Sequence, residues 1–141
     1  MLNMAWPIMI VVCANVCYHL SSKSVPGQVN AFASLTATYI VAAVASLVLF
    51  FITSPEKNFF AETMKLNWAS IILGLAIVGL EFGYIYVYRV GWKISLGSLV
   101  ANISLACVLM VIGALFFKDA LTLKEILGAA CCVVGLILVN I

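Results

Sequence analysis

Glu81 is the residue of this sequence with the strongest case for chemistry. It lies in the stretch GLEFGYIYVYR, inside a long apolar run, and it is the one carboxylate placed deep within such a run. An ionisable side chain in the middle of a membrane span is costly and usually faces a cavity or a partner. Glu81 therefore suits the exchange of a proton for a cationic or polar substrate. The alternative is a structural acid, protonated or hydrogen-bonded between two helices.

Other polar side chains are expected at a depth similar to that of Glu81. Asn15, Thr38 and Asn102 each fall within about one helical turn of this depth, if successive apolar runs cross in alternating directions. Helical spacing adds further residues one or two turns away: His19, Ser34, Tyr84, Tyr88 and Ser98. Together they predict a small polar cavity lined by four helices. The alternative is that the amides and hydroxyls only hydrogen-bond between helices.

Residues near the ends of the apolar runs are expected at the membrane interface. The imidazole of His19 can reach that level, so a structural or snorkelling role is favoured over a proton relay. Arg89 and Lys93 are interpreted as boundary charges. The tryptophans are interpreted as interface anchors: Trp6, Trp68 and Trp92.

The motifs of common enzymes do not occur in this sequence. It contains no Gly-rich phosphate loop, no HExxH, no nucleophile elbow and no paired carboxylates within an apolar run. All five cysteines lie in apolar runs, where they are interpreted as small packing residues rather than disulfides or zinc ligands. We therefore expect no catalytic residues, no metal site and no cofactor.

The elements that must position these residues are membrane-spanning helices. Of the 141 residues, 66% are hydrophobic and only 9% are charged, and the mean hydropathy is +1.25. A span needs about 20 apolar residues, and the apolar runs do not alternate as barrel strands would. The sequence predicts an all-α membrane protein with one transmembrane domain over residues 1–141 and five helices, at about 4–22, 30–53, 68–88, 95–117 and 124–141.

The connections contain recognisable start and stop signals. Pro7 is expected in the first turn of the first helix, and Pro26-Gly27 is expected to separate the first two helices. Thr122 and Glu125 form a capping-box pattern at the start of the last helix. The connection at residues 53–67 is the only one long enough for an amphipathic surface turn. The first apolar run lacks a basic leader and a cleavage pattern, so we expect it to be retained.

Small residues predict close approaches between helices. They occur in the third and fifth predicted helices, at Gly74, Gly79 and Gly83 and at Gly128, Ala129 and Gly135. Glycines two residues to either side of Glu81 would thin the local packing and admit a ligand.

The basic residues do not choose a membrane orientation. With five spans, Lys57, Lys65, Lys118 and Lys124 lie on one side, and Lys23, Arg89 and Lys93 lie on the other. Four against three is a negligible bias for a rule that depends on an excess of Lys and Arg. Either local details set the topology, or both orientations insert and pair. Because the seven cations are scattered, no basic stripe is present for nucleic acid.

The stretch GALFFKDALTLKEILGAACCVVGLILVN resembles the end of a repeat in the drug/metabolite transporter superfamily, particularly its EamA-like members. The resemblance implies a five-helix half of an inverted-repeat transporter, which needs an antiparallel copy of itself or a sister half. Small multidrug resistance proteins of the same superfamily carry a glutamate in the first helix, where this chain has Asn15 in VVCANVC. Any proton coupling must therefore use Glu81 in a different geometry.

The resemblance and the polar residues together predict a secondary transporter of small metabolites or drug-like compounds in a cell (inner) membrane, acting as a dimer by alternating access. Glu81 would be its ionisable group, with Asn15, Asn102 and Tyr84 as contacts. Two alternatives remain open: a subunit of a lipid-linked sugar flippase, and a purely structural membrane subunit.

Overall fold

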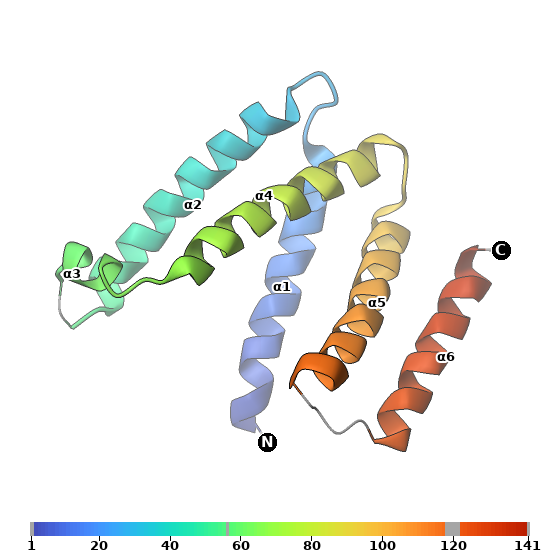
Figure 1. Ribbon diagram of the computed structural model, residues 1–141. Helices are drawn as coiled ribbons and strands as arrows, with labels where there is room; N and C mark the ends of the chain where they lie inside the picture. The colour runs from blue at the N-terminus through green and yellow to red at the C-terminus, as the bar shows by residue number, and fades with distance from the viewer. Residues whose placement is uncertain (1, 56, 118–121, 141) are drawn as a thin grey trace. The chain divides into compact units, whose positions relative to one another are not determined.

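The computed structural model describes residues 2–55, 57–117 and 122–140. Helices make up 85% of the chain, and no strand occurs in these ranges, which confirms the all-α prediction. In chain order the elements are α1 (Leu2–Ser24), α2 (Ala31–Thr53), α3 (Phe59–Thr63), α4 (Trp68–Arg89), α5 (Ile94–Ile112), the π-helical turn η1 (Gly113–Phe117) and α6 (Leu123–Asn140) (Figure 1).

Four of the described segments are long and apolar enough to cross a membrane. They are Ala5–Ser24, Ala31–Thr53, Trp68–Arg89 and Ile94–Phe117. The helix α6, with 18 residues, is not among them, so the fifth span stays a prediction. Lys118, the start of the connection before α6 and the predicted helix end at Ile141 lie outside the described residues.

Side-chain caps set where most of the helices begin. Asn30 Oδ1 accepts from the Phe32 backbone N–H at 2.9 Å, and Asn67 Oδ1 accepts from that of Ala69 at 3.0 Å. Such caps satisfy N–H groups that have no partner within the helix. Before α6 the predicted capping box is confirmed, because the Thr122 N–H donates to Glu125 Oε2 at 2.7 Å and the Glu125 N–H donates to Thr122 Oγ1 at 3.4 Å.

Two helix boundaries differ from the predictions. Because α1 begins at Leu2, Pro7 lies in its second turn rather than its first, where the missing proline N–H removes one helical hydrogen bond. The fourth predicted helix is not α-helical to its end, since it changes at Gly113 into the π-helical turn. A π-helical turn is a wider coil that still keeps its backbone hydrogen bonds internal, as a membrane span requires.

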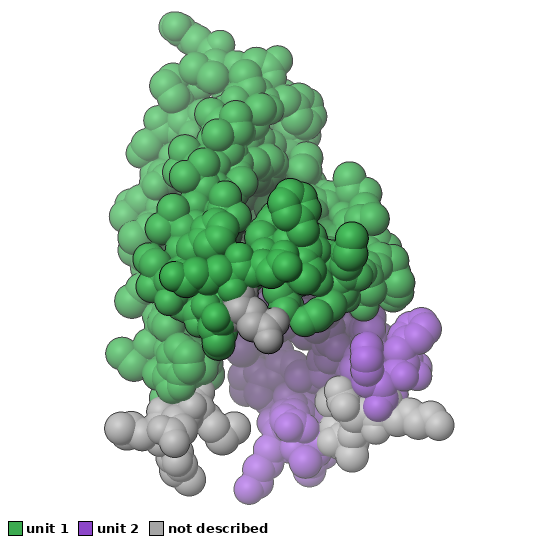
Figure 2. Space-filling view, turned by 90° about the vertical axis from the view of Figure 1, so that its left-hand side faces the viewer, with its two compact units in different colours: residues 1–90 green, residues 91–141 purple. Residues whose placement is uncertain are grey.

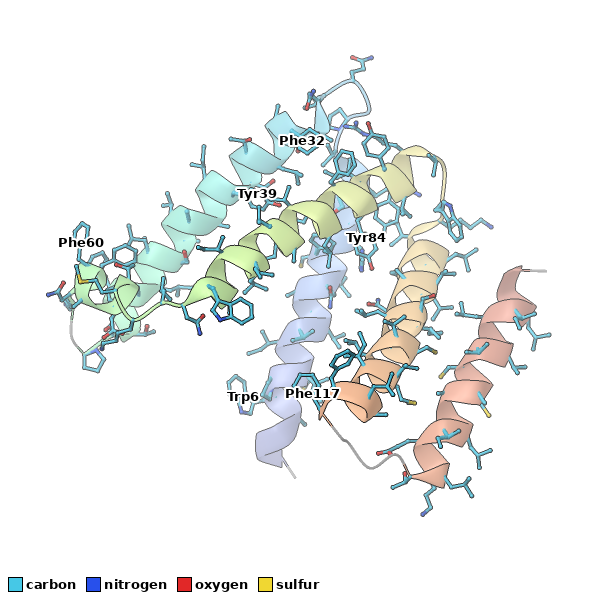
Figure 3. All side chains as sticks on the ribbon, in the orientation of Figure 1. Trp6, Phe32, Tyr39, Phe60, Tyr84 and Phe117 are labelled. Carbon is cyan, nitrogen blue, oxygen red and sulfur yellow. The ribbon has the colours of Figure 1, made fainter. Side chains whose placement is uncertain are left out.

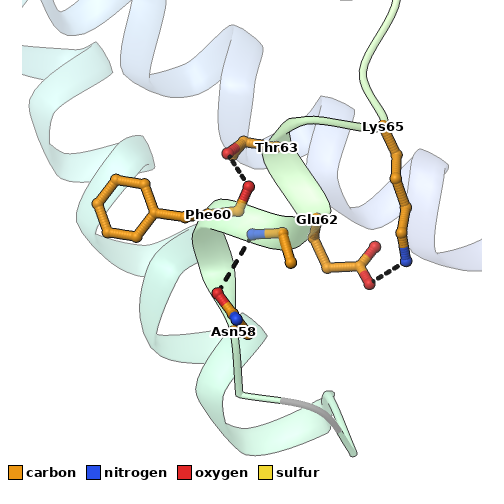
Figure 4. A network of polar contacts seen from close by, with 6 residues as sticks. Asn58, Phe60, Glu62, Thr63 and Lys65 are labelled. Atoms are coloured by element: carbon orange, nitrogen blue, oxygen red, sulfur yellow. Dashed lines mark hydrogen bonds and ion pairs between the residues drawn. The ribbon is translucent and has the colours of Figure 1, made fainter.

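The connection between α2 and α4 contains the predicted surface turn. The one-turn helix α3 is capped by Asn58, whose Oδ1 accepts from the Ala61 N–H at 3.2 Å (Figure 4). Lys65 Nζ lies 2.6 Å from Glu62 Oε1 at its other end. The Phe60 side chain is 78% exposed on the same helix, so α3 carries both charged and apolar side chains.

The chain divides into two compact units, residues 1–90 and residues 91–141 (Figure 2). Within the first unit, α4 packs against both α1 and α2 (Figure 1). A small apolar core joins α2 to α4, formed by Ala31, Leu35 and Ile85 with Tyr39 and Phe82 packed against it. Within the second unit, α5 packs against α6.

The glycines predicted to pack against other helices do not mark close approaches within either unit, so that prediction is wrong there. A Cβ added at any of the predicted packing glycines would meet no atom within 4 Å, namely at Gly74, Gly79, Gly83, Gly128 or Gly135. Four of the five cysteines are likewise exposed, and all five are free thiols. The reason is that each unit contains only two or three long helices, so most of the surface of each helix has no neighbouring helix packed against it.

Candidate functional site

Glu81 lines a cavity of about 100 Å³ inside the first unit. Residues with hydroxyl groups from two helices, α1 and α2, line the same space, namely Tyr18, Ser21, Ser22, Ser34 and Thr38. Leu35 and Ile85 of the apolar core complete the lining together with Val25, the residue after α1. The cavity therefore places one carboxylate among several hydroxyls, between helices that are otherwise apolar.

Helical periodicity explains how each helix presents its part of the site. On α4, Glu81, Ile85 and Tyr88 follow one another at spacings of four and three residues, so they share a face. On α1, Tyr18 and Ser22 are four residues apart, and on α2 the same holds for Ser34 and Thr38. Because α4 packs against both other helices, these faces meet in one place.

The tyrosines around Glu81 have unmet hydrogen-bonding capacity. The Tyr39 hydroxyl approaches Glu81, and the Tyr18 hydroxyl approaches Ser22 and interacts electrostatically with Glu81. Both hydroxyl oxygens are buried, yet neither completes a hydrogen bond of ordinary length and angle within the described residues. Buried polar groups are normally paired. The site can therefore accept one or two further polar contacts.

Next to this cavity, His19 is enclosed by aromatic rings between α1 and α4. Its side chain is 7% exposed, and its Nδ1 lies 2.9 Å from the Tyr88 hydroxyl. The ring centroids of Tyr84 and Tyr18 lie 4.8 Å and 5.2 Å from that of His19, both in edge-to-face arrangements. The snorkelling interpretation of His19 is therefore wrong, because the imidazole is buried and hydrogen-bonded to another helix.

The structure brings together most, but not all, of the predicted site residues. Glu81 and Thr38 line the cavity, and His19, Tyr84 and Tyr88 form the aromatic cluster beside it. Figure 3 shows the Tyr39 side chain extending from α2 toward α4, and the Tyr84 side chain on the side of α4 where α1 passes.

Three predicted residues are not part of this site within the first unit. Asn15 is exposed on α1 and does not line the cavity. Asn102 is exposed on α5 of the second unit, and Ser98 Oγ of the same helix donates to the Ile94 carbonyl at 2.8 Å. Within the first unit the cavity is lined by α1, α2, α4 and the residue after α1, and the predicted contribution of the fourth membrane helix stays a prediction. The sequence predicted the depth of each polar side chain along its helix, but it did not predict which face of the helix would turn toward the cavity.

Sequence reasoning missed Tyr18 and Tyr39. Their buried hydroxyl groups lack hydrogen-bond partners among the described residues, so they are candidates to contact a ligand. A signal existed for both. Tyr18 lies three residues after Asn15 and next to His19, and Tyr39 lies four residues after Leu35. Aromatic residues in an apolar run carry little contrast in hydropathy, so the polar tip of a tyrosine is easily overlooked.

This arrangement has the chemistry to bind a ligand. A carboxylate among hydroxyls and tyrosine rings attracts a proton or a cationic group. Among the described residues no group of three or more His, Cys, Asp or Glu side chains is placed to hold a metal ion. No protein-family model, no curated protein and no solved structure matches this chain.

Proposed function

We propose that this chain is a secondary transporter of small metabolites or drug-like compounds, with Glu81 as its ionisable group. The observation that carries the proposal is the position of Glu81, in a segment apolar enough to cross a membrane and on the wall of a cavity lined by hydroxyls. A carboxylate in such a segment is costly unless it serves a ligand, a proton or a partner.

The surroundings of Glu81 favour a cationic or polar substrate. The nearby Tyr18 and Tyr84 rings meet edge to face with centroids 5.7 Å apart, and ring faces of this kind attract organic cations. The incompletely bonded hydroxyls of Tyr18 and Tyr39 supply contacts for a polar group. Competition between a proton and such a substrate for one carboxylate couples their movements across the membrane.

The proposal includes a multi-pass inner-membrane location and a dimer working by alternating access. Five spans place the two ends of the chain on opposite sides, and the near-equal distribution of Lys and Arg permits insertion in either orientation. An antiparallel copy or a sister half would then complete the pathway, as in transporters with inverted repeats.

Proton release provides the direct test. A lipophilic quaternary cation and a panel of small amines are added to the purified full chain in weakly buffered detergent solution, at several pH values. We expect release from the native chain and from Glu62→Gln, a matched control because Glu62 pairs with Lys65 on the surface helix α3. We expect none from Glu81→Gln.

Two results would contradict the proposal. Equal release from native chain and Glu81→Gln would remove Glu81 from the coupling. Silence in every folded variant would favour an uncoupled flippase subunit or a structural subunit instead.

A further inference from the structure

The short helix α3 carries apolar and charged side chains on opposite sides. Phe60 and Met64 are four residues apart, so they lie on one side of this turn, whereas Glu62 and Lys65 form their ion pair on the other. Figure 4 shows the Phe60 ring and the Glu62–Lys65 pair on opposite sides of the ribbon. Phe60 and Met64 are 78% and 87% exposed, so the apolar side is open in the structure.

A contact with α2 fixes the level of α3 relative to a membrane. The rings of Phe59 and Phe50 meet edge to face, with their centroids 5.6 Å apart. Phe50 lies in the last turn of α2, a segment long and apolar enough to cross a membrane. The helix α4 is another such segment, and it begins at Trp68, five residues after α3 ends at Thr63. The helix α3 is thus tied to the place where two candidate spans reach the membrane surface.

The size and surroundings of the apolar side favour lipid as its partner. Two side chains on a single turn are far less than the roughly 800 Å² that a stable protein interface buries on each partner. Apolar surface also continues along the chain, because Leu66 and Trp68 are exposed, and tryptophan is enriched where a membrane meets water. An amphipathic helix at this level lies in the plane of the interface, with its charged groups toward water.

We propose that α3 is an interfacial anchor, in which Phe60 and Met64 insert at the boundary between phospholipid headgroups and acyl chains. The leaflet is the one in which α2 ends and α4 begins. Insertion of α3 holds the connection between these two helices, and therefore their ends, at a fixed level in the membrane. The inference does not depend on transport through Glu81, because no residue of α3 lines that cavity.

The test places a tryptophan on each side of α3 in the full chain. Phe60→Trp reports from the apolar side and Glu62→Trp from the charged side. The native tryptophans are changed to phenylalanine in both variants, namely Trp6, Trp68 and Trp92. Each variant is placed in phosphatidylcholine nanodiscs, where both membrane faces meet the medium. Bromine atoms on the acyl chains near the headgroup quench tryptophan emission from within the membrane, and iodide quenches it from water.

We expect the Phe60→Trp reporter to lose most of its emission in brominated lipid and to be severalfold less sensitive to iodide than the Glu62→Trp reporter. Equal sensitivity to iodide would overturn the proposal, because both sides of α3 would then lie in water. Protection of the Phe60→Trp reporter from both quenchers would also overturn it, because a protein surface rather than lipid would then cover the apolar side.

A second measurement keeps the native tryptophans. Phe60→Cys and Glu62→Cys are treated in nanodiscs with a charged maleimide that does not enter hydrocarbon, and peptide mass spectrometry follows labelling at each site. Neither position is buried, so both variants should fold, and all five native cysteines lie outside α3. We expect severalfold more labelling of Glu62→Cys than of Phe60→Cys. Equal labelling of the two variants would contradict insertion of the apolar side.

Discussion

In residues 1–90, polar side chains connect helices that are distant in the sequence, whereas in residues 91–141 the observed polar contacts of Ser98, Thr122 and Glu125 are local. The Tyr88–His19 and Arg89–Val29 contacts join residues 69 and 60 positions apart. The Ser98–Ile94 and Thr122–Glu125 contacts join residues four and three positions apart.

Burial follows the same division. The first unit contains a buried apolar core and the buried His19. In the described part of the second unit, Gly97 is the only buried residue. The first unit can therefore hold polar groups at fixed positions, which is what a binding site requires. The second unit presents mainly apolar surface, suited to lipid or to another protein chain.

The largest effect is expected from Arg89→Ala. This variant removes the charged hydrogen bond to Val29 and the weaker one to Pro26, so the free energy of unfolding should fall by about 2 kcal/mol. The matched change in the second unit is Lys124→Ala, an exposed cation that should alter it by less than about 0.5 kcal/mol. Unfolding by a denaturing detergent, followed by circular dichroism, measures both. If both variants lowered the free energy of unfolding equally, the two units would not differ in how their polar side chains stabilise them.

Tyr88→Phe should produce the next largest effect. It leaves the buried Nδ1 of His19 without its partner, at a cost of about 1.5 kcal/mol in the free energy of unfolding. Tyr86→Phe is the control on the same helix, because the Tyr86 side chain is 47% exposed and should lose little. If both variants unfold alike, the contact between α1 and α4 does not stabilise the first unit.

Thr122→Ala tests a purely local contact in the second unit. Loss of the cap should lower the free energy of unfolding by about 1 kcal/mol. Because the contact lies within one turn, amide hydrogen exchange should increase at the start of α6 and remain unchanged in α1, α2 and α4. Increased exchange in those three helices would show that the Thr122 cap affects the first unit as well, and that its effect is not local.

The smallest effect is expected from Gly79→Ala and Gly128→Ala, one in each unit. Alanine favours a helix interior over glycine by about 0.5 kcal/mol, and the added methyl meets no atom within 4 Å. Each variant should therefore slightly stabilise the monomer. Weaker association in a crosslinking assay, with a stabilised monomer, would identify that face as a contact between chains. A destabilised monomer would contradict the open surroundings described for these glycines.

Much of the fold was predictable because its signals are local. Apolar run length located α2 and α4 to within one residue, and the Thr122 and Glu125 pattern identified the start of α6. The asparagine caps at Asn30, Asn58 and Asn67 were present in the sequence but were not used. The π-helical turn at Gly113–Phe117 was not predictable, because hydropathy does not distinguish one helical form from another.

By itself the sequence determined that the chain is helical and that Glu81 is the acid to be explained, and it predicted five spans, of which four are long and apolar enough in the described residues. Only the tertiary structure decided that Tyr18 and Tyr39 accompany Glu81, that His19 is buried, and that Asn15 is not. The physical reason is that these helices are apolar on every side. Periodicity then gives no sign of which face will be buried, and the packing of α4 against α1 and α2 makes that choice.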